Sequence, residues 1–283
     1  MLFWIASYPK SGNTWLRSLI TTYFFTEDGV FNFKLLKNIP SYPSPFFFKD
    51  YKDKFDTPES TAKYWISEQE KINVRAKNSL TFLKTHNALC KINGYSFTNS
   101  INSIGAIYII RDPRNVISSI SNHYQVQLTD AFNFMKDKNK ALVFKEDERF
   151  LGFNALFSWS LNLRSWVECK MFPVLTVRYE DLDKNCYLTF EKILKFIIKT
   201  ANLKEAFNEK KAIMAVKTCH FDRLQSLEKE EGFDEAVNKR GSSEKIKFFN
   251  LGTKNNYKNL LDEKLINEMN KLYEVELKMF NYK

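Results

Sequence analysis

The segment from residue 2 to residue 24 constrains the fold most strongly, because it joins an apolar run, a short polar loop and an amphipathic run. Residues 2–6 (LFWIA) are continuously apolar, which is typical of a buried strand. Apolar side chains then recur with the period of one helix face at Trp15, Leu16, Leu19, Ile20, Tyr23 and Phe24. The segment therefore predicts a buried strand, a tight loop and a helix in direct succession.

The loop itself, residues 8–15 (YPKSGNTW), has the properties of an anion-binding site. A loop between a strand and a helix points backbone N–H groups and the positive end of the helix dipole at one place. Lys10 adds a positive charge, Ser11 and Thr14 add hydroxyl donors, and Gly12 lets the backbone approach an anion closely. The alternative interpretation is an ordinary turn that uses lysine and serine for solubility.

The loop differs from the Walker A motif, G-x-x-x-x-G-K-[ST]. The first glycine is missing, and Lys10 precedes Gly12 instead of following it. Thr14 is therefore poorly placed to bind Mg²⁺, and we expect a phosphate-binding loop that works without a metal.

Length and charge limit the classes of function that remain. The 283 residues suit one large α/β domain or two small ones, and we expect a single domain over residues 1–283. The chain has 43 Lys and Arg against 33 Asp and Glu, a net charge of +10. This excess favours an anionic partner such as a nucleotide, a nucleic acid or an acidic membrane surface, without choosing among them.

The cysteines and the N-terminus indicate the compartment. The four cysteines form no C-x-x-C pair, so we expect neither a zinc site nor a disulfide scaffold, and reduced cytosol is the default. The apolar run at residues 2–6 is too short for a signal peptide or a membrane span. We therefore expect a cytoplasmic protein with no transmembrane segment.

A lysine and a histidine follow a second predicted strand. Residues 79–83 predict the strand, and Lys84, Thr85 and His86 come directly after it. Enzymes of the α/β class place their sites at the carboxyl edge of the sheet. A lone histidine is more often structural than catalytic, but this position makes His86 a candidate for acid–base chemistry.

An arginine follows the third predicted strand. Residues 106–110 form a continuous apolar run typical of a central parallel strand, and Arg111 stands at its exit. Pro113 fits the first turn of the helix that comes next. Arg111 and Ser119, two turns into that helix, could bind one phosphate together, with the arginine bidentate. The alternative is an arginine–aspartate turn that caps the helix.

Three of these segments resemble motifs of the PAPS-dependent sulfotransferases, the cytosolic type of sulfotransferase domain. Residues 8–15 resemble the 5′-phosphosulfate loop of that family, residues 84–86 its lysine-threonine-histidine segment, and residues 111–119 its 3′-phosphate motif, in the same order along the chain. The resemblance implies a mostly parallel central sheet flanked by helices on both faces, like that of the P-loop kinases. It also implies 3′-phosphoadenylyl sulfate (PAPS) as the sulfuryl donor, which leaves as 3′-phosphoadenosine 5′-phosphate (PAP), and no metal.

The resemblance also implies a role for each candidate residue. His86 would be the general base of an in-line displacement, a role that a pKa near neutral suits. Lys10 would neutralise the departing oxygen, and Lys84 would bind the sulfuryl oxygens. The residues expected to bind the nucleotide are Lys10, Ser11, Gly12, Asn13 and Thr14 at the 5′-phosphate, Arg111 and Ser119 at the 3′-phosphate, Trp15 and Phe221 around adenine, and Tyr179 and Gly252.

The closing motif of the family, R-K-G-x-x-G-D-W-K-N, is only partly present. Gly252 matches it, but Asn250 and Leu251 replace the basic pair, and Asn255 replaces the second glycine. The loss of two positive charges predicts a weaker hold on the 3′-phosphate unless another cation substitutes; the candidates are Lys247, Lys254 and Arg240. The dense mixed charge of residues 222–247 predicts a solvated helix and loop, so residues 222–256 are a candidate mobile lid.

Two other functions use the same sequence features. A nucleotide kinase would share the architecture, although it normally needs the Walker lysine and an acid that holds magnesium. A noncatalytic binder of an anionic nucleotide or nucleic acid would use the basic surface without His86. The resemblance favours sulfuryl transfer with no nucleic-acid partner. The acceptor remains open: it could be a hydroxyl or an amine of a small molecule, a glycan or a lipid.

Overall fold

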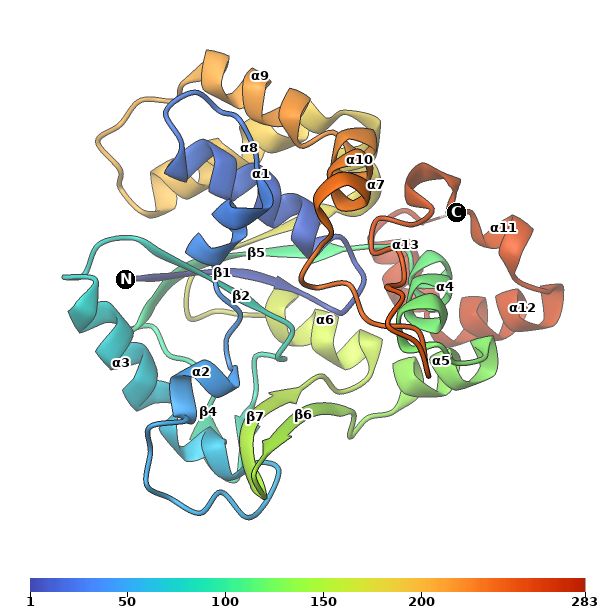
Figure 1. Cartoon of the computed structure of the whole chain (residues 1–283), viewed down its shortest axis with the longest axis horizontal. Helices are drawn as coiled ribbons and strands as arrows, with labels where there is room; N and C mark the ends of the chain where they lie inside the picture. Colours follow the sequence, from blue (N-terminus) through green and yellow to red (C-terminus); the bar gives the residue numbers. More distant parts are fainter. Residues whose placement is uncertain (283) are drawn as a thin grey trace.

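The computed structural model of the chain describes residues 1–282 and has a central sheet of four parallel strands in the order β2-β1-β5-β8 (Figure 1). The strands are β1 (Leu2–Ser7), β2 (Thr81–Thr85), β5 (Ser103–Ile110) and β8 (Val174–Arg178). Ala6 pairs with Thr85 on one side and with Tyr108 on the other. The parallel register therefore brings the carboxyl ends of the strands to one edge of the sheet.

Helices cover both faces of this sheet, and the strand β1 shows why. Its side chains alternate between two hydrophobic clusters, with Phe3 and Ile5 in one and Leu2, Trp4 and Ala6 in the other. The first cluster packs under α1 (Asn13–Phe25), α8 (Cys186–Thr200) and α9 (Glu209–Thr218). The second packs against α3 (Trp65–Arg75), α4 (Pro113–Tyr124) and α6 (Trp159–Val167). The α/β fold predicted from the sequence is confirmed.

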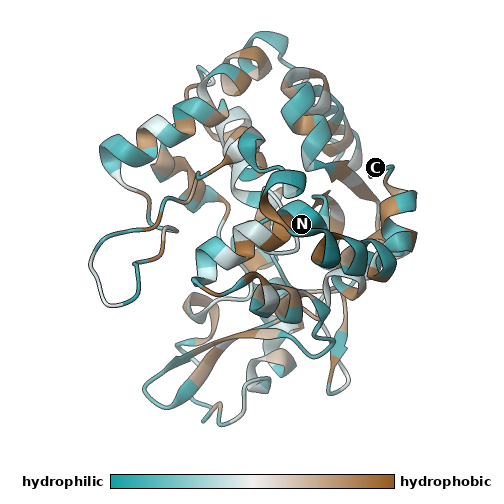
Figure 2. Cartoon of the chain, turned by 90° about the vertical axis from the view of Figure 1, so that its right-hand side faces the viewer, coloured by the Kyte–Doolittle hydropathy of each residue, from teal (hydrophilic) through white to brown (hydrophobic). Residues whose placement is uncertain are grey.

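The remaining elements lie around this core. Figure 2 shows polar and apolar stretches alternating along the peripheral helices, as expected where a helix packs by one face. These elements are η1 (Phe33–Asn38), α2 (Pro45–Phe48), η2 (Ser60–Tyr64), β3 (Lys91–Ile92), β4 (Tyr95–Ser96), α5 (Leu128–Lys136), β6 (Ala141–Glu146), β7 (Arg149–Ala155), α7 (Tyr179–Lys184), α10 (Phe221–Glu231), η3 (Gly252–Lys254), α11 (Tyr257–Leu260), α12 (Glu263–Leu272) and α13 (Glu274–Met279).

The second strand begins and ends two residues later than the sequence predicts. Ser79 is still part of the turn after α3, because its N–H donates to the carbonyl of Ala76. Lys84 and Thr85 continue the pairing with β1, opposite Ile5 and Ala6. His86 is therefore the first residue beyond the strand, at the carboxyl edge of the sheet.

Within residues 1–282 there is no helix that combines the length and the apolar character needed to cross a membrane.

Candidate active site

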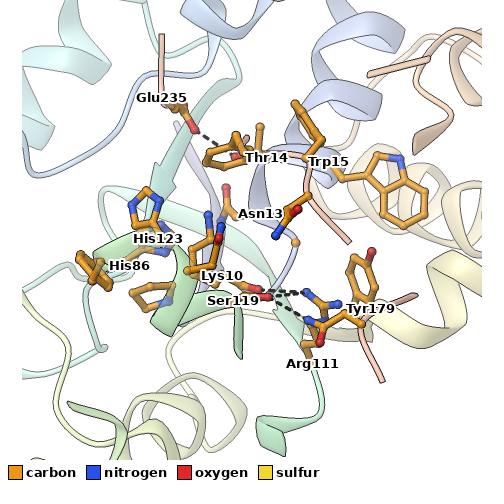
Figure 3. A pocket seen from close by; sticks show the side chains of 18 of the residues that line it. Lys10, Asn13, Thr14, Trp15, His86, Arg111, Ser119, His123, Tyr179 and Glu235 are labelled. Carbon is orange, nitrogen blue, oxygen red and sulfur yellow. Dashed lines mark hydrogen bonds between the residues drawn. The ribbon is translucent and has the colours of Figure 1, made fainter. Parts of the chain in front are cut away.

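One cavity of about 600 Å³ opens at the carboxyl edge of the sheet and collects residues from every predicted motif (Figure 3). Of the residues predicted to form the site, those that line it are Lys10, Gly12, Asn13, Thr14, Trp15, Lys84, His86, Arg111, Ser119, Tyr179, Phe221 and Gly252. Ser11 lies between two lining residues and is 1% exposed. The topology thus brings together side chains from residue 10 to residue 252.

The loop between β1 and α1 depends on two residues with left-handed backbone. Lys10 has φ 65° and Gly12 has φ 100°. A Cβ atom on residue 12 would lie 2.5 Å from Cδ2 of Tyr179, so a glycine is needed both for the backbone angle and for the packing. The helix α1 begins at the next residue, and its first three residues, Asn13, Thr14 and Trp15, line the cavity. The first N–H groups of a helix are a ready site for an anion.

Some side chains of the loop make structural contacts, and others keep a hydrogen-bond donor for a ligand. Asn13 donates its amide N–H groups to the carbonyl of Ile5, at 3.0 Å, and to Oγ of Ser7, at 3.1 Å, which fastens α1 to β1. The hydroxyl of Ser11 is buried and has no hydrogen-bond partner among the described residues. A buried hydroxyl without a partner is costly, so an anion that accepts its hydrogen bond fits here.

His86 is oriented by its contact with the end of β1. Its Nδ1 lies 2.8 Å from the carbonyl oxygen of Ser7. A carbonyl only accepts hydrogen bonds, so the contact favours the tautomer with hydrogen on Nδ1 and leaves the lone pair of Nε2 for another group. Burial, together with the charge of Lys84, lowers the pKa of His86 to about 3. This pKa lies well below the near-neutral range that suits a general base, because the histidine is deeply buried, which the sequence does not show.

Two lysines bring positive charge to the cavity. Burial, reinforced by the charges of Lys84 and Arg111, lowers the pKa of Lys10 to about 8. The Nζ of Lys10 lies 3.9 Å above the ring of Phe248. Burial also lowers the pKa of Lys84. Removing cations from water is costly, and an anion bound between them would offset that cost.

Glu235 enters this site and was not predicted from the sequence. It accepts hydrogen bonds from Arg17, at 2.5 Å, and from the hydroxyl of Thr14, at 3.0 Å, and lies 3.8 Å from Nζ of Lys84. Burial raises the pKa of the Glu235 carboxyl, but Lys84 and Arg17 outweigh burial and lower it to about 2. Its place in the charged stretch 222–247 predicted a solvated side chain. The available signal was the apolar pair Phe233 and Ala236 on either side of it.

The predicted 3′-phosphate pair is brought together as expected. The guanidinium of Arg111 is 3.5 Å from Oγ of Ser119 and stacks on the ring of Tyr179, with 4.2 Å between Cζ and the ring centroid. Nε of Arg111 is buried and has no partner within residues 1–282. The capping alternative applies to a different arginine, since Asp112 caps α4 and pairs with Arg114 at 2.7 Å.

The two adenine candidates are Trp15 and Phe221. The ring of Trp15 contacts that of Tyr179 with 5.5 Å between centroids, and its Nε1 donates to the carbonyl of Cys219. The ring of Phe221 packs against Gly252, where a Cβ atom would lie 2.5 Å from it. Phe221 and Trp15 therefore both line the cavity, and Gly252 gives Phe221 its space.

The closing segment, residues 249–255, carries a second residue that the sequence did not single out as a ligand. Asn255 is 6% exposed and donates from Nδ2 to Oγ of Ser119, at 3.0 Å, and to the carbonyl of Asn115, at 2.9 Å. None of the three cations considered as substitutes for the missing basic pair lines the cavity in the described part of the chain; these are Lys247, Lys254 and Arg240.

The rest of the cavity wall is largely apolar. It includes Leu142, Val143 and Phe144 of β6 together with Tyr124 and Phe248, and polar lining is added by Ser41, Asn122 and His123. Across residues 1–282, no three histidine, cysteine, aspartate or glutamate side chains gather in a way that could hold a metal ion.

Comparison with known proteins gives matches over nearly the whole chain. A family model described as a sulfotransferase domain matches residues 2–281. Flavonol 4′-sulfotransferase of Flaveria chlorifolia is 26% identical over 96% of this chain and 78% of its own length. Luciferin sulfotransferase of Photinus pyralis is 26% identical over 93% of this chain and 68% of its own length. The solved structure of mouse sulfotransferase SULT7A1 complexed with PAP has a TM-score of 0.56 at 18% identity, and the match covers 97% of this chain and 84% of that chain.

Proposed function

Because the chain belongs to the sulfotransferase domain family, whose model spans residues 2–281, we propose that it transfers a sulfuryl group from PAPS to a hydroxyl or an amine of a small acceptor. One observation carries the proposal. A single cavity contains an anion-binding loop, an arginine–serine pair and a neutral histidine whose Nε2 is available. These are the groups that a bisphosphate donor and a proton-losing acceptor require.

The residues present fit PAPS as the donor. The buried hydroxyl of Ser11 and Nε of Arg111 are both without protein partners in the described residues, and both donate to anions. Gly12 gives the loop its left-handed backbone and leaves room for the ring of Tyr179 behind it. The mouse relative of similar fold was solved with PAP, which supports the same nucleotide here. When bound, PAPS supplies the sulfuryl group.

His86 is proposed to act as the general base. Its Nδ1–H donates to the carbonyl of Ser7, and Nε2 takes the proton of the acceptor as the new oxygen–sulfur or nitrogen–sulfur bond forms. The bond between sulfur and the bridging phosphate oxygen breaks, and the electron pair leaves with PAP. The negative charge of the nucleotide raises the basicity of His86 above its value in the free protein.

The lysines stabilise the charge that moves during transfer. Lys10 lies in the loop and neutralises charge on the departing oxygen, and Lys84 attracts the sulfuryl oxygens. Glu235 holds Lys84 and Thr14 in place from the opposite side of the cavity. The charge that a metal supplies in kinases is supplied here by these cations and by backbone N–H groups.

The apolar wall supports a ring-bearing acceptor. Phe144 of β6 and the ring of Tyr124 offer flat contact surface, and Val143 adds apolar contact. The curated relatives include enzymes named for a flavonol, a luciferin and a steroid. A small planar alcohol or phenol fits better than a glycan. The relative named cytosolic sulfotransferase 12, of Arabidopsis thaliana, supports a cytoplasmic location.

The test is a transfer assay with sulfur-labelled PAPS against phenols, steroid alcohols, amines and oligosaccharides. We expect label in a phenol or steroid product from the wild-type chain and at least a hundredfold less from His86→Ala. The absence of transfer to every acceptor class, combined with Mg²⁺-dependent turnover of ATP, would instead assign the site to a kinase.

A further inference from the structure

Asn255 occupies a position for which the closing motif predicts a glycine, and its side chain reaches into the predicted 3′-phosphate site. The inference below rests on the proposed function. Asn255 is buried, lines the cavity and belongs to the same segment as Asn250 and Leu251, which replace the basic pair. A buried side chain therefore fills the expected glycine position, next to the two positions where the motif has lost its positive charges.

The amide of Asn255 is oriented by three hydrogen bonds. Oδ1 accepts from the hydroxyl of Ser118 at 2.7 Å. The carbonyl of Asn115, 2.9 Å from the other end, only accepts hydrogen bonds, so it fixes which end of the amide carries the hydrogens. Nδ2 therefore faces α4 and donates one hydrogen to the carbonyl of Asn115 and the other to Oγ of Ser119. Since both hydrogens are already used, the amide cannot donate to a phosphate without giving up a protein contact. Asn255 is thus poorly placed to be a direct ligand.

The contact instead determines what the hydroxyl of Ser119 can do. An oxygen of this kind has two lone pairs and one hydrogen. Two N–H groups point at the oxygen of Ser119, Nδ2 of Asn255 at 3.0 Å and the guanidinium of Arg111 at 3.5 Å. With its lone pairs occupied, the hydroxyl can act only as a donor. Its protein acceptor, the carbonyl of Asn115, is at 3.5 Å and already accepts from Asn255.

We propose that Asn255 is a positioning residue for recognition of the 3′-phosphate: by donating to Ser119 it turns the hydroxyl hydrogen of Ser119 toward the phosphate. A hydroxyl that accepts a hydrogen bond also donates a stronger one. The same amide attaches the closing segment to α4 through Asn115, Ser118 and Ser119. The missing basic pair would attract the phosphate by its charge. In this chain, the neutral amide of Asn255 takes over part of that role through its contacts.

The test measures how strongly each variant distinguishes PAP from AMP, which lacks the 3′-phosphate. Calorimetry on the full chain should show that Asn255→Ala weakens PAP about tenfold and leaves AMP within twofold, tenfold corresponding to about 1.4 kcal/mol. Asn255→Asp should weaken PAP further, because a carboxylate accepts the Ser119 hydrogen and repels the phosphate. Asn256→Asp is the matched control, because it adds the same negative charge one residue later on an exposed side chain. It also keeps the oxygen that accepts the backbone N–H of Lys258 at the start of α11.

A double substitution shows whether the effect passes through Ser119. In a Ser119→Ala background, Asn255→Ala should change PAP affinity less than twofold. Equal losses of PAP and AMP on Asn255→Ala would overturn the proposal and leave Asn255 a purely structural residue, as would a full tenfold loss in the Ser119→Ala background. Unchanged affinity for PAP would also overturn it. A wild-type chain that binds PAP and AMP equally would instead contradict the proposed donor, before any variant is made.

Discussion

The two ends of the proposed nucleotide site, the loop of residues 8–15 and the closing segment of residues 249–255, are built in different ways. The loop is part of the strand-to-helix connection between β1 and α1, and its shape depends on left-handed backbone at Lys10 and Gly12. The closing segment has little regular structure and is attached to α4 through the side chain of Asn255. The loop depends on backbone geometry, whereas the closing segment combines left-handed backbone at Gly252 with the side-chain contacts of Asn255.

This difference explains why one end matches the family motif and the other departs from it. Backbone N–H groups at a helix start bind an anion only if the chain follows one path, which leaves few sequence choices at Gly12 and its neighbours. A segment attached by side chains can exchange cations for amides and still keep its place. We therefore expect substitutions in the loop and its sheet edge to affect chemistry and stability strongly, and substitutions in the closing segment to adjust affinity.

The largest effect is expected at His86, which lies with the loop at the carboxyl edge of the sheet. His86→Ala should lower kcat by about 10²–10⁴ and leave PAP affinity within threefold, because a general base acts in the transition state. His86→Asn is the matched variant, since its amide can still donate to the carbonyl of Ser7. The melting temperature of His86→Asn should therefore be closer to that of the wild type than the melting temperature of His86→Ala, while its turnover stays as low. Near-normal turnover in either variant would remove His86 as the base.

The next effect concerns the rigidity of the loop. Gly12→Ala places a methyl group 2.5 Å from Cδ2 of Tyr179 at φ 100°, whereas Gly94→Ala, at φ 86°, meets no described atom within 4 Å. Urea unfolding should give a loss of about 1–2 kcal/mol for Gly94→Ala, the backbone cost alone. Gly12→Ala should cost about 1–3 kcal/mol more from overpacking and should abolish PAP binding. Equal losses would mean that the loop can yield, and the comparison between the two ends would fail.

A smaller effect follows from the lowered pKa of Lys10. Burial and neighbouring cations bring this pKa to about 8, so the free protein loses the Lys10 charge as pH rises through 8. A bound anion favours the charged form, and phosphate ionisation is nearly complete above pH 7 because its second pKa is about 6. PAP affinity should therefore fall about tenfold from pH 7 to pH 9. Lys10→Arg keeps its charge, so the fall should disappear in that variant. A parallel fall in both proteins would assign the titration elsewhere.

The smallest effect is expected when the missing charge is restored to the closing segment. Asn250 is exposed at the rim of the cavity, so Asn250→Arg should strengthen PAP binding only a few-fold, less than the 1.5–3 kcal/mol of a buried charged hydrogen bond. Calorimetry at low and high salt would show the gain shrinking with screening. A gain above a hundredfold would mean that the segment depends on charge as strongly as the family motif does.

The sequence predicted the half of the site that follows strands. Lys84, His86 and Arg111 were found because polar residues after buried strands gather at one sheet edge, and the parallel register of β1, β2 and β5 brings them there. Ser119 followed from its spacing along one helix. These predictions needed only local pattern and a general rule of topology.

The half that was missed depends on contacts between distant segments. Glu235 meets Thr14 across 221 residues, and Asn255 meets Ser119 across 136. Phe233 and Ala236 flank Glu235, but the dense charge of residues 222–247 outweighed this apolar signal. The lowered pKa of His86 was not predicted for a related reason, because burial depends on how the whole chain packs. The predicted lid at residues 222–256 stays a prediction.

The most direct measurement of the central claim is calorimetric titration of the wild-type chain with PAP and with AMP under the same salt and pH. If the loop binds the 5′-phosphate while Arg111 and Ser119 bind the 3′-phosphate, PAP should bind at least a hundredfold more tightly than AMP, because two charge-assisted contacts are lost with the 3′-phosphate. Equal affinities for the two nucleotides would contradict the account.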